Sequence, residues 1–111
     1  MLPKNNRLNL AREFRHLKRD GRALPTPFFT LLYRFSPQQS VVKVGFIVSN
    51  KVGGAVVRGR IKRLLREVVH QKLPALPTGL EMVLIAKTQK DKWDYEKLLA
   101  EFNKILPKIR P

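Results

Sequence analysis

The chain has 111 residues, 43% of them hydrophobic, and no cysteine, which suffices for one domain with its own core and excludes disulfides and thiolate metal sites. Its 23 Lys and Arg residues outnumber 8 Asp and Glu residues, so the net charge is +15, and such a charge destabilises a compact chain unless a polyanion relieves the repulsion. No apolar run approaches the ~20 residues that span a membrane, and the charged N-terminus is unlike a secretory signal, so we expect a cytoplasmic protein with no membrane partner.

The basic residues are concentrated in the first part of the chain. Residues 1–66 carry fifteen Lys and Arg against two Asp and Glu, and no acidic residue occurs from Gly21 to Arg66. A merely solubilising surface usually mixes the two signs, whereas a surface of one sign is typical of proteins that bind nucleic acid. We therefore favour a nucleic-acid partner.

A helix is predicted first, over residues 9–20. Leu10, Phe14 and Leu17 recur at helical spacing, and Gly21 follows as a stop. Taken alone, the Phe14 ring is better explained as part of this core stripe than as a platform for a base.

Two strands are predicted next, after a stretch at 23–27 whose two prolines allow at most a turn or a short edge strand. In residues 28–35 and 41–49 the side chains alternate between an apolar face and a mixed face. The apolar faces hold Phe29, Leu31, Tyr33 and Phe35, then Val42, Val44, Phe46 and Val48. The mixed faces hold Phe28, Thr30, Leu32 and Arg34, then Lys43, Gly45, Ile47 and Ser49. The apolar faces predict the core, and the mixed faces are not polar enough to be simply solvated.

The second half of the chain is predicted to add a helix at 55–71, an interior strand at 80–87 and a final helix that Asp94 caps. The segment from 41 to 87 is long enough for its two strands to pair in parallel with the helix as crossover. The order helix–strands–helix–strand–helix (αβββαβα-like) indicates an α+β fold, a two-layer α/β sandwich with a parallel βαβ crossover. Residues 1–111 are predicted to form a single domain.

The helix at 55–71 carries five basic side chains within nine positions: Arg58, Arg60, Lys62, Arg63 and Arg66. One apolar stripe is expected to pack on the sheet while the cations cover the other sides. That stripe is Val57, Ile61, Leu64, Leu65 and Val68. No acid at i,i+4 offsets the cations. Because guanidinium groups bind phosphate through two prongs and stack on bases, the helix predicts a nucleic-acid surface.

Two glycines, Gly53 and Gly54, precede this helix. They allow either plain turn chemistry or the close approach of a phosphate to the helix N-terminus, and both explanations stay open. The phosphate-binding pattern GxxxxGK[ST] is absent from the sequence.

Catalysis by the chain itself is not predicted. Its two histidines, His16 and His70, each follow a glutamate at i−3, which is better explained by surface ion pairs than by a catalytic or metal pair. The other carboxylates do not resemble a two-metal nuclease cluster. We expect no catalytic residue and no metal site on the protein.

From Lys51 to Glu67 the sequence KVGGAVVRGRIKRLLRE resembles the signature of the bacterial ribonuclease P protein subunit, roughly K-x-G-N-A-V-x-R-N-R-x-K-R-x-x-R-E. The similarity covers the whole chain, including the LPKxxRL opening, VGFIVS before the motif and VLIAK after it. Gly54 and Gly59 stand where the family usually has Asn, and aromatic residues are frequent in the family where this chain has Lys18 and Leu32.

The resemblance implies the protein subunit of ribonuclease P, an endoribonuclease complex in which a catalytic RNA with bound Mg²⁺ removes the 5′ leader of precursor tRNA. One copy of the protein would act beside one RNA. The residues expected to contact the catalytic RNA are Lys51, Arg58, Arg60, Lys62, Arg63 and Arg66. A cleft at the mixed strand faces would hold the leader, lined by Phe14, Phe28, Thr30, Leu32, Ile47, Ser49 and Lys87. Bases would stack on exposed rings there, at ~1–3 kcal/mol each.

Two other classes of protein share some of these features. A structural RNA-binding protein of the ribosomal type would have the same charge and basic helix, but the long motif and the mixed strand faces argue against it. A DNA-binding module would place the helix in a major groove. Because the charge spreads around the helix, it suits a broad phosphate surface better than the edges of bases.

Overall fold

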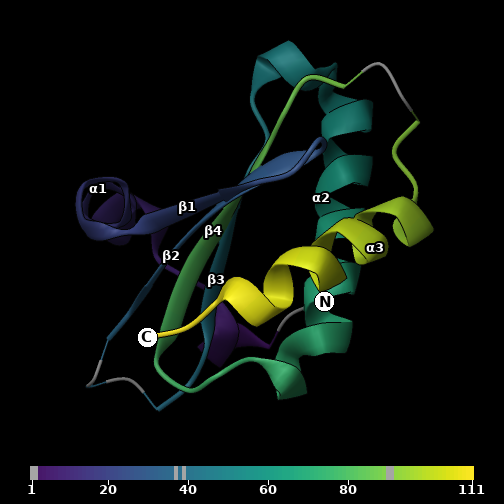
Figure 1. Ribbon diagram of the computed structural model, residues 1–111. Helices are drawn as coiled ribbons and strands as arrows, with labels where there is room; N and C mark the ends of the chain where they lie inside the picture. Colours follow the sequence, from purple (N-terminus) through teal and green to yellow (C-terminus); the bar gives the residue numbers. More distant parts are fainter. Residues whose placement is uncertain (1–2, 37, 39, 90–91) are drawn as a thin grey trace.

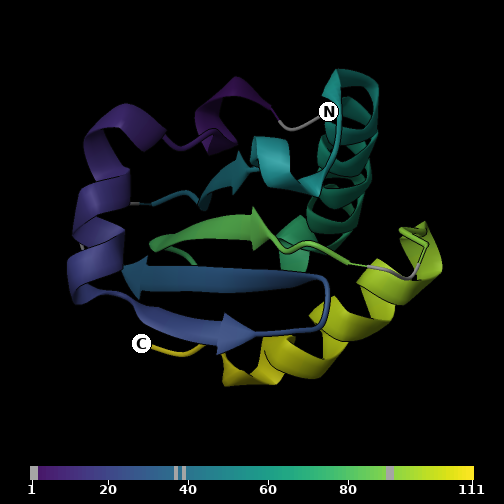
Figure 2. The same cartoon turned by 90° about the horizontal axis from the view of Figure 1, so that it is seen from above.

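A four-stranded sheet lies at the centre of the fold (Figure 1). In the computed structural model, which describes residues 3–36, 38, 40–89 and 92–111, its strands are β1 (Arg22–Pro25), β2 (Phe29–Phe35), β3 (Lys43–Ile47) and β4 (Leu80–Ala86). They lie side by side in the order β1-β2-β4-β3 (Figure 2). β2 pairs antiparallel with β1 and β4, whereas β3 pairs parallel with β4. The predicted parallel crossover is therefore confirmed, and the proline-containing stretch forms an edge strand.

The described residues form three α-helices: α1 (Leu10–Asp20), α2 (Ala55–Lys72) and α3 (Tyr95–Ile105). They also form 3-10 turns at Lys4–Asn6, Asn50–Val52, Leu73–Ala75 and Leu106–Lys108. The side chain of Asp94 accepts a hydrogen bond from the N–H of Lys97 (2.8 Å), which confirms the predicted cap of the last helix. None of the described helices combines the length and apolar character needed to cross a membrane.

One face of the sheet packs against α2 and α3 to form the main core. On β4 the alternate residues Leu80, Met82 and Leu84 are fully buried. The helix residues buried with them are Ile61, Leu65, Val68 and Val69 of α2 and Leu98, Phe102 and Ile105 of α3. On β2 the predicted core residues Phe29, Leu31 and Tyr33 are buried in the same cluster. The α+β fold is confirmed.

The opposite face of the sheet, here called the second face, packs against α1. Figure 1 shows α1 on one side of the sheet and α2 on the other. Leu17 of α1 and Val83 of β4 are buried in a smaller cluster, with Leu10 and Phe14 partly buried beside them. Gly45 of β3 makes room for this contact, since a Cβ atom there would lie 2.6 Å from Cδ2 of Leu10. The predicted two layers therefore describe the sheet with α2 and α3, while α1 adds cover on the other side.

The predicted apolar stripe of α2 is wrong at its first position. Val57 is 47% exposed and Val56 is 87% exposed, whereas Val69 is completely buried. α2 contacts the Asn50–Val52 turn as well as β3, and the side chain of Val57 lies beside Gly53, just after that turn. The stripe that holds the helix on the sheet therefore begins at Ile61.

Candidate nucleic-acid interface

The two glycines before α2 have different surroundings. A Cβ atom at Gly53 would lie 2.8 Å from Cγ1 of Val57, so this position needs a glycine for packing. A Cβ atom at Gly54 would meet nothing within 4 Å, and no side chain caps the helix there. Packing thus accounts for Gly53, while the space beside Gly54 is open to solvent or to an anion.

The six predicted basic residues lie on and just before α2, and they form what is here called the basic surface. It consists of Lys51, Arg58, Arg60, Lys62, Arg63 and Arg66. Arg58 and Lys62 are partly buried and the other four are exposed. Within the described part of the chain, none of the six forms an ion pair with a carboxylate. No carboxylate among the described residues therefore neutralises the positive charge of this surface.

Backbone carbonyls hold two of these arginines in place. Nε of Arg58 donates to the carbonyl of Gly53 (3.1 Å), and Nη2 of Arg60 donates to the carbonyl of Trp93 (3.2 Å). A guanidinium has five N–H donors, so each arginine keeps donors for a phosphate after making this bond. The contacts reduce the rotamer freedom that each side chain would lose on binding.

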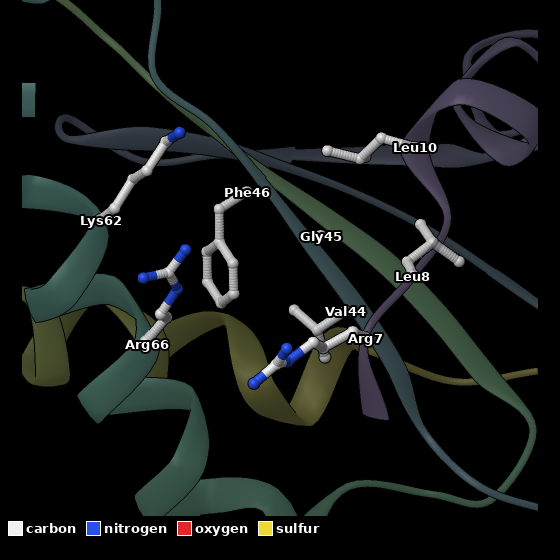
Figure 3. Close-up of a pocket in the computed structure, with 8 residues that line it drawn as sticks. All are labelled: Arg7, Leu8, Leu10, Val44, Gly45, Phe46, Lys62 and Arg66. Atoms are coloured by element: carbon white, nitrogen blue, oxygen red, sulfur yellow. The ribbon is translucent and has the colours of Figure 1, made fainter. Parts of the chain in front are cut away.

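The N-terminal segment completes a pocket beside the basic surface (Figure 3). Arg7 forms an isolated bridge with Val44 of β3, and the N–H of Leu8 donates to the carbonyl of Val44 (2.9 Å). The pocket has a volume of about 340 Å³, and its walls come from the N-terminal segment, the first residue of α1, β3 and α2. Sequence patterns do not place Arg7 here, because its contact with β3 joins residues far apart in the chain.

The second face carries the mixed strand faces, where the family resemblance implies a cleft for the leader. Thr30 of β2 lies opposite Ile85 of β4, which in turn lies opposite Ile47 of β3. All three side chains are partly exposed, as is Leu32 in the next row. This row of side chains, Thr30–Ile85–Ile47, is here called the open row. Ile85 was missed, although alternation along the strand at 80–87 could have placed it on this face.

Other predicted cleft residues lie around the open row. The ring of Phe14 on α1 is partly exposed, and Nζ of Lys18 lies 5.8 Å from its centroid. Ser49 is exposed just after β3. Nζ of Lys87 donates to the carbonyl of Thr26 (2.7 Å), so this lysine holds the turn between β1 and β2. An ammonium group has three donors, which leaves two for another partner.

Phe28 does not lie on the second face, and its predicted place in the cleft is wrong. Its side chain is 6% exposed within the main core. The hydroxyl oxygen of Thr26 accepts hydrogen bonds from the N–H groups of Phe28 (3.3 Å) and Phe29 (2.9 Å). The chain therefore turns here, and β2 begins only at Phe29. Alternation along the strand therefore does not extend to Phe28, whose ring cannot stack on a base.

An ion-pair network links α1 to the sheet at the other end of the second face. Arg34 of β2 contacts Glu81 of β4 (Nε to Oε1, 2.7 Å) and Glu13 of α1 (Nη2 to Oε2, 2.9 Å). The hydrogen bond from Arg12, with the nearby positive charges, lowers the pKa of Glu13. Nδ1 of His16 lies 3.7 Å from Glu13, which is the predicted i,i+3 contact. The described residues contain no group of three or more His, Asp or Glu side chains that could hold a metal ion.

Comparisons of sequence agree on one family. The Ribonuclease P family profile matches residues 2–110. The chain is 35% identical over 98 residues to the ribonuclease P protein component of Natranaerobius thermophilus, covering 88% of this chain and 84% of the relative. It is 34% identical to that of Streptomyces bikiniensis, covering 98% and 95% of the two chains.

Solved structures show the same fold. The RNase P protein from Thermotoga maritima in complex with 1-(4-fluorophenyl)-2-thiourea has a TM-score of 0.83 at 25% identity, covering 94% of this chain and all of that one. An RNase P protein mutant from Staphylococcus aureus has a TM-score of 0.84 at 20% identity, covering 94% of this chain and 87% of that one. The order and packing of the elements described above are therefore those of RNase P proteins.

Proposed function

The chain belongs to the ribonuclease P protein family, and we propose that it binds a catalytic RNA and helps that RNA to remove the 5′ leader of precursor tRNA. In this proposal one copy of the protein acts with one RNA in the cytoplasm. The hydrolysis belongs to the RNA and its Mg²⁺ ions, and the protein contributes binding and charge.

The main structural support for this function is the basic surface on α2, a helix whose other side is packed in the core. Ile61 and Leu65 hold α2 rigidly, while Arg63 on the same helix is exposed. Because the cations have no carboxylate partners among the described residues, a phosphate backbone can neutralise them without first breaking ion pairs. Each neutralised phosphate releases condensed counter-ions, which makes the binding favourable and dependent on salt.

The open row supports the second part of the proposal, contact with the leader. It offers partly exposed apolar side chains with Phe14 at its border, and such surfaces bind single strands through stacking and apolar contact. Lys87 and Lys18 supply positive charge near it for the phosphates. Mature tRNA lacks the leader, so this surface would favour the precursor.

The RNA partnership is tested by measuring the affinity of the protein for a bacterial ribonuclease P RNA over a range of salt concentrations. Arg63→Gln should flatten the log–log salt dependence by about 0.7–0.9 and leave the folding stability unchanged, because it removes one phosphate contact from an exposed position. Ile61→Ala is the matched control on the same helix. It should lower stability by ~2–5 kcal/mol, because Ile61 is only 1% exposed. An unchanged salt slope in Arg63→Gln together with a large loss of stability would contradict the assigned surface.

A further inference from the structure

The pocket beside α2 lies along the outer edge of β3, the edge strand of the sheet. Lys62 and Arg66 reach it from α2, Leu8 and Leu10 close the opposite wall, and Gly45 lies at its floor (Figure 3). Its volume of about 340 Å³ is at the lower end of the range for small-molecule pockets, which suits a single nucleotide.

The side chains that line this pocket are positively charged, apolar and aromatic. Arg7, Lys62 and Arg66 supply three cations, and none of the described lining residues is acidic. The guanidinium carbon of Arg66 lies 6.0 Å from the ring centroid of Phe46. Figure 3 shows the Arg66 guanidinium beside this ring, with the ends of Lys62 and Arg7 on either side. A guanidinium plane and an aromatic ring both stack on nucleobases, and the flanking cations can neutralise a phosphate.

The backbone of β3 adds hydrogen-bonding groups to the pocket. The carbonyl of Val42, just before β3, accepts from Nδ2 of Asn6 (2.8 Å), and the carbonyl of Val44 in β3 accepts from the N–H of Leu8 (2.9 Å), so alternate residues of this stretch face the edge. The N-terminal segment then turns away into α1. Phe46 is the next residue in the series, and within the described part of the chain no strand pairs with its outward N–H and C=O. These groups can bond the edge of a base.

We propose that this pocket receives one unstacked nucleotide of the bound RNA. The base lies against Phe46 and Arg66, and its phosphate lies between Lys62 and Arg7. The inference rests on the proposed function, because it names the part of the RNA that the Lys62–Arg66 side of α2 holds. The cations would also attract an acidic peptide added to the edge of β3, but the stacking surface of Phe46 and Arg66 favours a nucleotide.

The binding test uses nuclear magnetic resonance of the full chain with four separate probes: adenosine 5′-monophosphate, ribose 5-phosphate, adenosine and a short acidic peptide. Adenosine 5′-monophosphate should shift the backbone amides of Gly45, Phe46 and Lys62 and bind most tightly of the four. Phe46→Leu should weaken it by about fivefold or more, the low end of the contribution of one stacked base, and leave ribose 5-phosphate unchanged. Lys62→Gln, which removes a positive charge and leaves the Phe46 ring in place, should weaken both phosphate-bearing probes and leave adenosine unchanged. Arg63→Gln, outside the pocket, should bind all four as the wild type does.

If the peptide bound more tightly than adenosine 5′-monophosphate, the pocket assignment would be overturned. It would also be overturned if the phosphate-bearing probes shifted the amides of Arg63→Gln and Lys62→Gln by equal amounts. A second measurement separates a failure of the pocket assignment from a failure of the proposed function. With the catalytic RNA, Phe46→Leu should lower affinity without changing the salt slope, because it removes no charge. An affinity unchanged by Phe46→Leu but lowered by Arg63→Gln would overturn the nucleotide pocket alone. No salt-dependent binding of the RNA by the wild type would overturn the proposed function as well.

Discussion

Phe28 packs edge to face against Trp93, with ring centroids 5.3 Å apart and an angle of 65° between the ring planes. The contact joins the start of β2 to the segment before α3, and both rings are buried. The carbonyl of Trp93 also accepts the hydrogen bond of Arg60. The aromatic pair therefore supports the position of an arginine of the basic surface from inside the core.

Phe28→Ala should lower the free energy of unfolding by ~3–5 kcal/mol, since it removes a buried ring and leaves a cavity beside Trp93. Urea denaturation followed by circular dichroism measures this. Phe14→Ala is the matched control and should cost less than ~2 kcal/mol, because part of its ring already contacts water. Equal losses in the two variants would show that Phe14 is as much a core residue as Phe28.

Phe14→Ala should instead weaken the preference of the holoenzyme for precursor over mature tRNA, by ~1–3 kcal/mol if one base stacks on the ring. The affinities of both tRNA forms, measured with wild-type and variant protein, give this preference directly. The affinity for the catalytic RNA should stay the same, because the basic surface is unchanged. If both tRNA forms lost affinity by the same factor, Phe14 would have no contact specific to the leader.

Alternation along the strands predicted the two faces of β2 correctly from Phe29 to Tyr33, because alternation is a local property of an extended chain. It failed at Phe28, where hydrogen bonds to the hydroxyl of Thr26 turn the backbone before the strand begins. Helical spacing likewise predicted Ile61 as core but not the exposure of Val57, which depends on where α2 meets the sheet. The pocket at Arg7 could not be predicted, because it forms only when the N-terminal segment reaches the edge of β3.

The Glu13 network makes stability depend on pH. The pKa of Glu13 is lowered below its ordinary value of 4.5, first by the hydrogen bond from Arg12. The folded protein therefore binds the proton less readily than the unfolded chain, so the stabilisation is present above the unfolded pKa and is lost as pH falls through the folded pKa. Wild type should exceed Glu13→Gln in stability at pH 7, and the difference should shrink as the pH falls below about 4.5. A difference that stayed constant from pH 7 to pH 3 would contradict the role of the Glu13 charge.

Gly59 lies within α2 with nothing within 4 Å of the position of a Cβ atom, and it is exposed. Gly59→Ala should therefore raise the melting temperature, since alanine in a helix is favoured over glycine by about 0.5–1 kcal/mol. Gly53→Ala is the contrasting variant. It should lower the melting temperature, because its Cβ would lie 2.8 Å from a methyl group of Val57. A destabilised Gly59→Ala would mean that α2 is not regular at this position.

The central claim is that the chain assists an RNA that does the chemistry, and precursor-tRNA cleavage at low Mg²⁺ concentration tests it most directly. The assay compares a bacterial ribonuclease P RNA alone, the RNA with the wild-type chain, the RNA with a variant carrying Arg58→Gln, Arg60→Gln and Arg63→Gln, and the chain alone. We predict that the wild-type chain restores removal of the 5′ leader where the RNA alone is slow, that the variant does so only weakly, and that the chain alone leaves the substrate intact. Equal cleavage rates with and without the chain, or cleavage by the purified chain alone, would contradict the claim.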